Sequence, residues 1–323
     1  MIKRSSKMNK RLMGWCCFVF CWSLLCFSAQ SVLGASHYPC GGEGVNGAVL
    51  PPSHLPIPDN PDTSALHCQS KLIYYSADQI TDDNGDKALD ADLDIFAFVQ
   101  RFIWMKKINE TSDWGLHLLI PLQSIDLNLS VPGGPTVADD DQIGLGDIVV
   151  EGLYAIHKQN YDIALAGGLI LPTGSYDSTE PASTGLGYTS IILTAGLNYK
   201  FGEKNLWSVS ALNRFLINFE QDETGITPGN EFLIEWGVGR VIPYTPTFLI
   251  TPGIVGHTYL QVSEDRGDTA IDTEKESSGI GIECNFFSLK NAIQVNVRAS
   301  TEFNVENDSK GNRFEVKFTK SFF

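Results

Sequence analysis

The sequence predicts an all-β protein, a transmembrane antiparallel β-barrel of about 12 strands of the outer-membrane type. Three observations predict this fold: long segments that alternate apolar and polar residues, connections that are alternately short and long, and an N-terminal export leader. In such a barrel each strand turns one face to lipid and the other to a polar lumen, so side-chain character alternates with a period of two.

Residues 1–35 have the three-part pattern of a secretory signal peptide. Five basic residues precede an apolar run from Leu12 to Phe27, and small residues follow. This is the arrangement of a cleaved leader, and we expect cleavage between Ala29 and Ala35. An uncleaved anchor helix is the alternative. No other stretch approaches the ~20 apolar residues that a spanning helix needs.

Composition narrows the class of protein. The mean hydropathy of -0.05 is low for a helical membrane protein, whereas a barrel exposes only half of each strand to lipid. The net charge of the chain is -15, and the leader holds five cations and no acid, so the mature chain reaches -20. A surface this acidic excludes nucleic acid as a probable partner.

Residues 36–70 are rich in proline and glycine and show no periodicity. We expect an extended segment that is periplasmic or forms a plug in the barrel mouth. Cys40 and Cys68 both lie here, and in an exported protein they form a possible disulfide. Cys284 instead alternates with Ile280, Ile282 and Phe286, which predicts a single lipid-facing thiol.

Residues 71–323 form the predicted barrel. Twelve strand-like runs begin near Lys71, Leu93, Trp114, Gly146, Tyr161, Tyr188, Leu206, Glu231, Thr247, Gly279, Asn291 and Arg313. An even number brings both termini to the same side of the membrane, which in bacterial barrels is the periplasmic side. The eleventh run is the clearest, because apolar or small residues alternate with polar ones from Ile293 to Val305.

The connections alternate in length. Short links follow the even runs, at 106–112, 157–160, 202–205, 243–246 and 288–290, and longer acidic links follow odd runs, at 78–90, 131–142, 172–187, 220–230 and 263–278. Short periplasmic turns and long external loops are typical of outer-membrane barrels. A soluble β-sandwich gives no reason for this alternation. Aromatic residues flank the short links, as expected of an interfacial girdle: Trp104, Trp114, Tyr161, Tyr199, Phe201, Trp207, Tyr244, Phe286 and Phe287.

The same phase assigns charged residues to the lumen. The candidates are Arg101, Glu151, Arg214, Glu235, Arg298, Glu302 and Lys317. Charges of both signs predict a mutually paired, partly closed lumen, and they either set the selectivity of a constriction or brace the wall across strands. Glu235 and Arg298 are the first candidates for a constriction, because each interrupts an otherwise uncharged inward row.

No catalytic, cofactor-binding or metal site is predicted. His117, His157 and His257 are scattered, and catalysis would need a nucleophile, a base and an orienting group in one pocket. The acidic cluster Asp139-Asp-Asp141 lies in a predicted external link. It either provides solubility or binds divalent cations that bridge to lipopolysaccharide, since such cations favour carboxylate oxygens.

Four stretches resemble a known family. They are His37–Gly44 with Leu50-Pro-Pro52, Tyr75–Asp78 with Asp82–Gly85, Gln100–Trp104, and Gly144–Ile148 followed by Leu171–Asp177. In this order and spacing the chain resembles the MetA-like outer-membrane transporter family, the proteins involved in the meta-pathway of phenol degradation. Cys40 and Cys68 depart from its pattern.

The resemblance implies a barrel channel for passive uptake of small apolar or aromatic compounds, without a cofactor. The expected partners are outer-membrane lipid, lipopolysaccharide, such solutes, and the barrel-assembly machinery during biogenesis. A structural or surface-interaction barrel with a plugged lumen is the alternative from another class. An outer-membrane barrel hydrolase is a third.

Overall fold

The computed structural model describes residues 64–268, 270 and 274–322, which form a β-barrel. The predicted signal peptide, most of residues 36–70, Cys40 and Phe323 lie outside these residues. Within the described part of the chain, no helix is long and apolar enough to cross a membrane.

The strands are long and follow one another along the chain, as alternating sequences with short connections favour. Their bounds are β1 Ser64–Thr81, β2 Lys87–Asn109, β3 Ser112–Ser130, β4 Thr136–Leu145, β5 Ile148–His157, β6 Tyr161–Leu171, β7 Ser190–Phe201, β8 Trp207–Asn218, β9 Glu231–Arg240, β10 Ile242–Thr245, β11 Phe248–Gln261, β12 Glu276–Ser288, β13 Ile293–Glu306 and β14 Ser309–Phe322. A 3-10 turn, η4, covers Glu203–Asn205 between β7 and β8.

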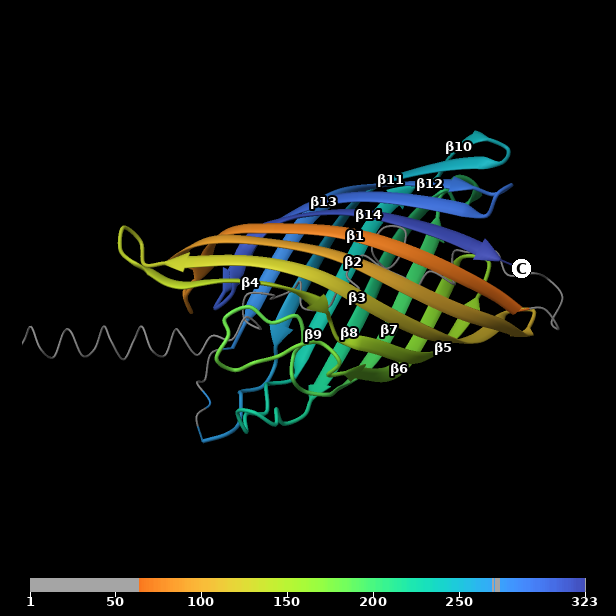
Figure 1. The fold of residues 1–323 in the computed structure, drawn as a ribbon. Helices are drawn as coiled ribbons and strands as arrows, with labels where there is room; N and C mark the ends of the chain where they lie inside the picture. The colour runs from red at the N-terminus through yellow and green to blue at the C-terminus, as the bar shows by residue number, and fades with distance from the viewer. Residues whose placement is uncertain (1–63, 269, 271–273, 323) are drawn as a thin grey trace, which may run out of the picture.

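All strand pairs are antiparallel, and the sheet closes on itself (Figure 1). β1 pairs with β14 from Leu66↔Phe322 to Ile80↔Ser309, which joins the first strand to the last. β4 pairs with the second half of β3 and β5 with the first half, so β4 and β5 occupy one strand position. β10 likewise prolongs β9 along β11. The fourteen strands therefore make a closed barrel of twelve strand positions, and the predicted fold class is confirmed.

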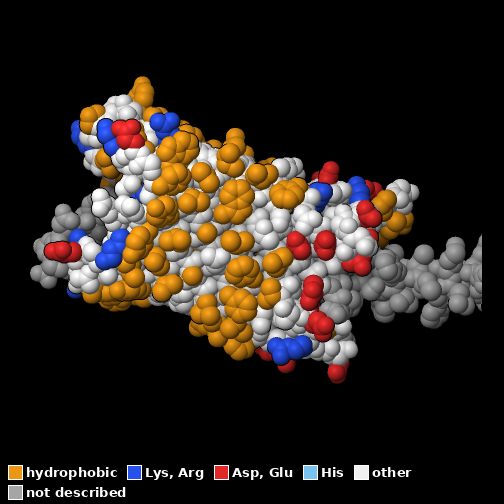
Figure 2. All heavy atoms as spheres, turned by 180° about the vertical axis from the view of Figure 1, so that it is seen from behind, with side chains coloured by type: hydrophobic (Ala, Val, Ile, Leu, Met, Phe, Trp, Pro, Cys, Tyr) orange, Lys and Arg blue, Asp and Glu red, His pale blue; other side chains and the backbone are white. Residues whose placement is uncertain are grey.

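The outer surface is apolar between two polar ends (Figure 2). Large hydrophobic side chains point outward along the strands, for example Phe96 at 50% exposure and Leu116 at 52%. The short connections gather at one end, here called the turn end, together with the pairs Trp104–Trp114 and Phe201–Trp207. The opposite end, the loop end, carries most of the exposed acids in Figure 2. An apolar band with aromatic residues at its border is the surface that a bilayer requires.

Three expectations about boundaries were wrong. β1 begins at Ser64 and not at Lys71, because Ala65 and His67 already alternate inward against β2 and β14. The expected external link 131–142 is largely β4, which forms a hairpin with β3. The link 78–90 shrinks to a turn at 82–86. Where a strand extends beyond the membrane, neither of its faces has to be apolar. A strand rich in acidic residues therefore has no apolar periodicity there, and its sequence resembles that of a loop.

Candidate functional site

The barrel interior holds all seven charged residues that the phase of the strands assigned to it. Their side chains alternate with the outward apolar ones and are buried: Arg101, Glu151, Arg214, Glu235, Arg298, Glu302 and Lys317. The inward direction of these residues follows from the period of two. Their role at a constriction stays a prediction.

One group of interior bonds links β2, β3, β5 and β7. The Arg101 Nε donates to His117 Nε2, and the other His117 ring nitrogen lies 2.7 Å from the Glu151 carboxylate. The Thr194 hydroxyl donates to the second oxygen of Glu151 at 3.0 Å. Because β6 separates β5 from β7, this last bond bridges strands that are not neighbours. His117, which looked isolated in the sequence, is therefore a central member of the interior.

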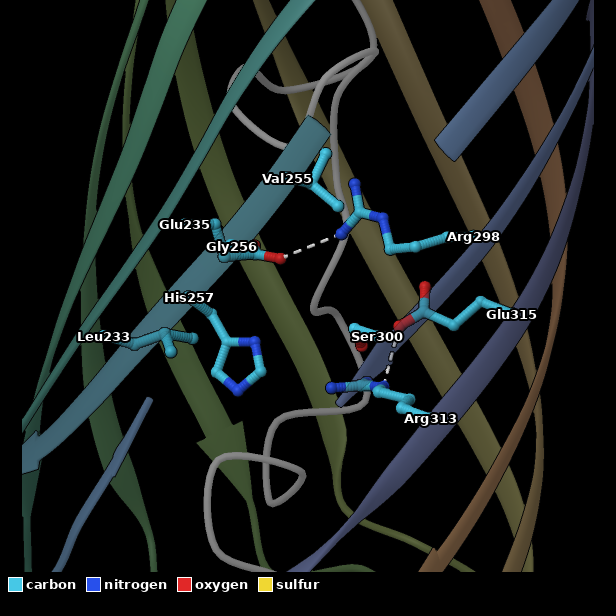
Figure 3. Close-up of a pocket in the computed structure, with 9 residues that line it drawn as sticks. All are labelled: Leu233, Glu235, Val255, Gly256, His257, Arg298, Ser300, Arg313 and Glu315. Atoms are coloured by element: carbon cyan, nitrogen blue, oxygen red, sulfur yellow. Dashed lines mark hydrogen bonds and ion pairs between the residues drawn. The ribbon is translucent and has the colours of Figure 1, made fainter. Parts of the chain in front are cut away.

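A second group crosses the interior on the opposite side. The Glu235 carboxylate of β9 binds Arg214 of β8 at 3.1 Å and Arg298 of β13 at 3.5 Å. Arg298 also binds Glu283 of β12 at 2.8 Å. Since β11 and β12 lie between β9 and β13, the Glu235–Arg298 pair spans two intervening strands (Figure 3). The two first candidates for a constriction are thus bonded to each other.

A third group lies on β14 and β1. Glu315 binds Lys71 at 3.2 Å and Arg313 at 2.7 Å. These three residues and Glu283 were not among the sequence candidates, although each has the inward phase of its strand. Including them, eleven charged residues face the interior, and we call this set the charged belt. It has six cations (Lys71, Arg101, Arg214, Arg298, Arg313 and Lys317) and five acids (Glu151, Glu235, Glu283, Glu302 and Glu315). Pairing of this density is what bracing of the wall would require, and the choice between bracing and selectivity stays a prediction.

Beside this charged belt, one layer nearer the loop end, the interior wall is apolar. Seven successive strands from β1 to β8, β4 aside, contribute buried residues at most 5% exposed: Ile73, Ala97, Val99, Leu119, Val149, Ile170, Ile192 and Leu216. We call this set the apolar arc. Val99 lies two positions from Arg101 of the belt, and Leu119 lies two positions from His117, which is bonded to Arg101. A water-filled barrel has a polar interior, so the arc is a departure from an ordinary porin wall.

A cavity of about 20 Å³ lies in the interior, beside β9, β11, β13 and β14, the strands opposite the arc (Figure 3). It is lined by Leu233, Glu235, Val255, Gly256, His257, Arg298, Ser300, Arg313 and Glu315. This volume holds about one water molecule or one small polar group. The cavity therefore has a mixed wall, with two arginines, two glutamates, a histidine and a serine beside the apolar Leu233 and Val255.

The connection 172–189 folds back against the barrel instead of extending from it. Its residues Ala182, Thr184 and Tyr188 are at most 4% exposed, and Ala182 packs with Tyr75 and Leu127 of the wall. Two of the motifs quoted above hold it in place. Asp147, between β4 and β5, accepts hydrogen bonds from Gly174 N at 2.9 Å and Leu186 N at 2.7 Å.

Burial raises the pKa of the Asp147 carboxyl, and the backbone hydrogen bonds from Gly174 and Leu186 oppose that shift. Gly174 and Gly185 are in direct backbone contact, and a Cβ at Gly174 would lie 2.5 Å from the Gly185 Cα. The sequence signal was the glycines of both motifs. The hydrogen bonds themselves could not be predicted from the sequence, because the donors Gly174 and Leu186 lie 27 and 39 residues from Asp147.

We expect Asp147→Ala to release this connection. Two backbone donors lose a buried acceptor, at a cost of about 1–3 kcal/mol each. The rate of protease cleavage within 172–189 on intact cells should rise at least tenfold. Asp177→Ala is the matched control, because Asp177 is exposed in the same connection and bonds only within its own turn to Thr179. Equal cleavage of both variants would contradict the assignment of Asp147.

The wall between β13 and β14 is incomplete. Their ladder ends at Thr301↔Asn312, although β13 continues to Glu306 and β14 begins at Ser309. The Glu302 carboxylate occupies the gap and accepts from Gly311 N at 2.8 Å and from the Tyr75 hydroxyl at 2.9 Å. Glu302 thus closes a breach in the ladder and satisfies a backbone donor that the wall leaves without a strand partner.

A hollow of about 510 Å³ lies on the outer face beside this breach. It is lined by Tyr74, Ser76, Ile280, Gly281, Ile282, Ala299, Ser300, Thr301, Asn312, Arg313 and Phe314. Ser300 and Arg313 line both this hollow and the interior cavity. At these two residues the interior cavity and the outer hollow therefore adjoin the same part of the wall.

The cysteines and His157 lie outside the three interior groups described above. Cys284 faces outward as a free thiol, as predicted. Cys68 lies on the outer face of β1, and since Cys40 lies outside the described residues, their disulfide stays a prediction. His157 binds Asp113 and Asp162 at the turn end. No group of three or more His, Cys, Asp or Glu side chains in residues 64–268, 270 and 274–322 is arranged to hold a metal ion.

Solved structures of similar shape are outer-membrane barrels. The chain is similar to the COG4313 outer membrane channel from Pseudomonas putida F1, with 17% identity, 85% of this chain and 100% of that chain covered, and a TM-score of 0.71. The CymD monoaromatic hydrocarbon channel shares 12% identity over 92% of this chain and 99% of that chain, with a TM-score of 0.42. The β domain of the Bordetella autotransporter BrkA shares 12% over 81% and 100%, with a TM-score of 0.45.

In sequence, no curated protein matches the chain. A family profile does match, over residues 77–318, and it is described as "Putative MetA-pathway of phenol degradation". That range includes all of the interior belt apart from Lys71, almost all of the apolar arc, and the Asp147 motif with its partner. The chain belongs to this family of outer-membrane barrels.

Proposed function

We propose that the protein is an outer-membrane channel for the passive uptake of small apolar or aromatic compounds. The observation that carries this proposal is the apolar arc, Ile73 to Leu216, on the interior wall. Water alone would favour polar side chains there, whereas an apolar solute gains about 25 cal/mol for each Å² of apolar surface that it buries. The arc gives such a solute a surface to follow inside the barrel.

The breach between β13 and β14 supports a way out toward lipid. Ser300 and Arg313 line both the interior cavity and the outer hollow, so the interior and the outer face come close together at this place. Glu302 holds the breach through Gly311 and Tyr75. Leaving through the wall spares an apolar solute from entering water on the far side.

The proposal includes an orientation, with the turn end in the periplasm. Short turns and both ends of the described chain lie at the turn end, which fits the periplasm, and the acidic loop end fits the cell exterior. There the acids are available to cations that bridge to lipopolysaccharide. Assembly by the barrel-assembly machinery is part of the same proposal.

A structural barrel with a closed lumen is the second candidate, favoured by the density of buried ion pairs in the belt. The two candidates differ in flux. Intact cells that produce the protein should take up an apolar naphthylamine, which fluoresces when it reaches lipid, at least several-fold faster than cells without it. A sugar of similar size should show no such gain.

The matched variant for this test is Leu119→Asn, which places an amide within the arc. We expect naphthylamine uptake to fall toward the background of cells without the protein. Leu116→Asn changes the same residue type on the outer face of β3, where Leu116 is 52% exposed, and it should retain uptake once surface amounts are equalised. Uptake at background from a correctly assembled wild-type barrel would favour the structural candidate.

A further inference from the structure

Arg313 is an interior cation with a guanidinium nitrogen that donates no hydrogen bond within the described residues. Its Nε lies 2.7 Å from Glu315, and its side chain is only 10% exposed. Its Nη2 is buried and has no hydrogen-bond partner in residues 64–268, 270 and 274–322. A buried guanidinium nitrogen without a partner is costly, because burial removes the water that would otherwise solvate it.

The unused nitrogen is aimed into the interior cavity. Figure 3 shows Arg313 reaching from β14 toward His257 of β11, with Ser300 above the end of its side chain. Arg298 lines the same cavity, so two guanidinium groups and a hydroxyl converge on a space for about one small polar group. Planar, forked donors of this kind match a carboxylate, which accepts two parallel hydrogen bonds.

The acids that face this space are already engaged. Glu235 binds Arg214 and Arg298, Glu315 binds Lys71 and Arg313, and Glu302 is held by Gly311 and Tyr75. Of the six belt cations, Lys71, Arg298, Arg313 and Lys317 come from three neighbouring strands, β1, β13 and β14. The same three strands carry two belt acids, Glu302 and Glu315, so four cations against two acids leave this side with an excess of two positive charges.

Apolar surface lies on both sides of the same space. Leu233 and Val255 are cavity residues, 4% and 2% exposed. β7 is six strands from β14 in either direction around the barrel. Ile192 of β7 belongs to the apolar arc, so part of the arc lies across the interior from β14. A bound molecule therefore meets cations at one end and apolar side chains around its body.

We propose that Arg313, with Arg298 and Ser300, forms a binding site for the carboxylate of small apolar monocarboxylic acids, such as aromatic acids, on their way through the barrel. The inference rests on the proposed channel function and names a substrate class for it. The head group takes the cavity, and the apolar body lies along Leu233, Val255 and the arc. Neutral aromatic compounds have no carboxylate, so they contact the arc and do not bind at Arg313.

The test measures entry of radiolabelled benzoate into liposomes that carry the refolded full mature protein, at pH 8, where benzoate is an anion. Entry into protein-free liposomes is subtracted. We expect wild-type protein to admit benzoate much faster than acetate, and Arg313→Gln to lower benzoate entry about tenfold, the loss expected for one charge-assisted pair. Arg313→Lys should keep part of it.

Arg266→Gln is the matched control, because Arg266 is an exposed arginine in the loop before β12. It should leave benzoate entry unchanged. Heat-modifiable migration reports whether each variant is folded. If Arg313→Gln does not fold, Ser300→Leu serves instead: it fills the cavity with an apolar side chain, keeps Arg313, and should also abolish the preference for benzoate.

The outcomes separate the two proposals. Equal benzoate entry through wild-type protein and folded Arg313→Gln overturns the site. No benzoate entry, with naphthylamine uptake in cells intact, also overturns the site and leaves the channel function standing. Failure of both solutes to enter removes the channel function itself. Reduced benzoate entry with unchanged naphthylamine uptake in Arg313→Gln supports the carboxylate site.

Discussion

Replacing Glu235 with glutamine is expected to lower the free energy of unfolding of the barrel by about 3–5 kcal/mol. Glu235 is 3% exposed and pairs with Arg214 and Arg298. The substitution preserves shape and removes the charge, so two buried guanidinium groups lose a shared counter-ion. The loss exceeds that of an ordinary pair because Glu235 links strands on both sides of β11 and β12.

Urea unfolding of the protein refolded into vesicles measures this change, followed by tryptophan fluorescence and by heat-modifiable migration. Glu276→Gln is the matched control. Glu276 lies near the loop end of β12, and its carboxylate accepts a hydrogen bond from Asn304 in an exposed pair. We expect that control to differ from wild type by less than about 1 kcal/mol. Similar values for the two variants would show that the interior is hydrated enough to solvate unpaired arginines.

Replacing Val297 with arginine is expected to cost about 2–4 kcal/mol, the value for a cation near the midplane of the bilayer. Val297 faces outward on β13 between Val295 and Ala299, and its register partners Cys284 and Val316 have the same outward phase. Neither register partner, Cys284 or Val316, can pair with the new charge. The amount of heat-modifiable barrel in the outer membrane should fall accordingly.

Asn304→Arg tests the same charge at the loop end of the same strand. Asn304 is exposed and lies beside Glu276, so the arginine remains in water and gains a partner. Inward Asn296 is a poor comparison, because it is 2% exposed, bonded to Glu283 and paired with Lys317. Equal assembly of Val297→Arg and Asn304→Arg would mean that this face of β13 does not meet lipid.

The barrel could be predicted from the sequence because lipid imposes a strict rule. A backbone in the bilayer must pair all its polar groups, and the outward side of each strand must be apolar. Phe314, Val316 and Phe318 satisfy that rule, and the phase they set places Lys317 inside. The same reasoning put all seven candidate charges in the interior without any knowledge of their partners.

Beyond the bilayer the rule no longer holds, and prediction failed there. β4 carries Asp139, Asp140 and Asp141, which resemble a solvated loop, yet they pair with β3. Which charges meet also depends on register and barrel closure. Glu235 and Arg298 are 63 residues apart, and Asp147 reaches Leu186 across 39. Such contacts arise from the closed sheet and have no local signature.

The breach between β13 and β14 also has a consequence for how the wall moves. Where the ladder stops at Thr301↔Asn312, amide hydrogens on the facing edges have side chains in place of a partner strand. Local opening is easiest where backbone bonds are fewest. Deuterium should therefore enter the amides of β13 and β14 that face each other beyond Thr301 and Asn312 before it enters the amides of the paired ladder. The long β1–β14 seam, paired from Leu66 to Ile80, should exchange among the last.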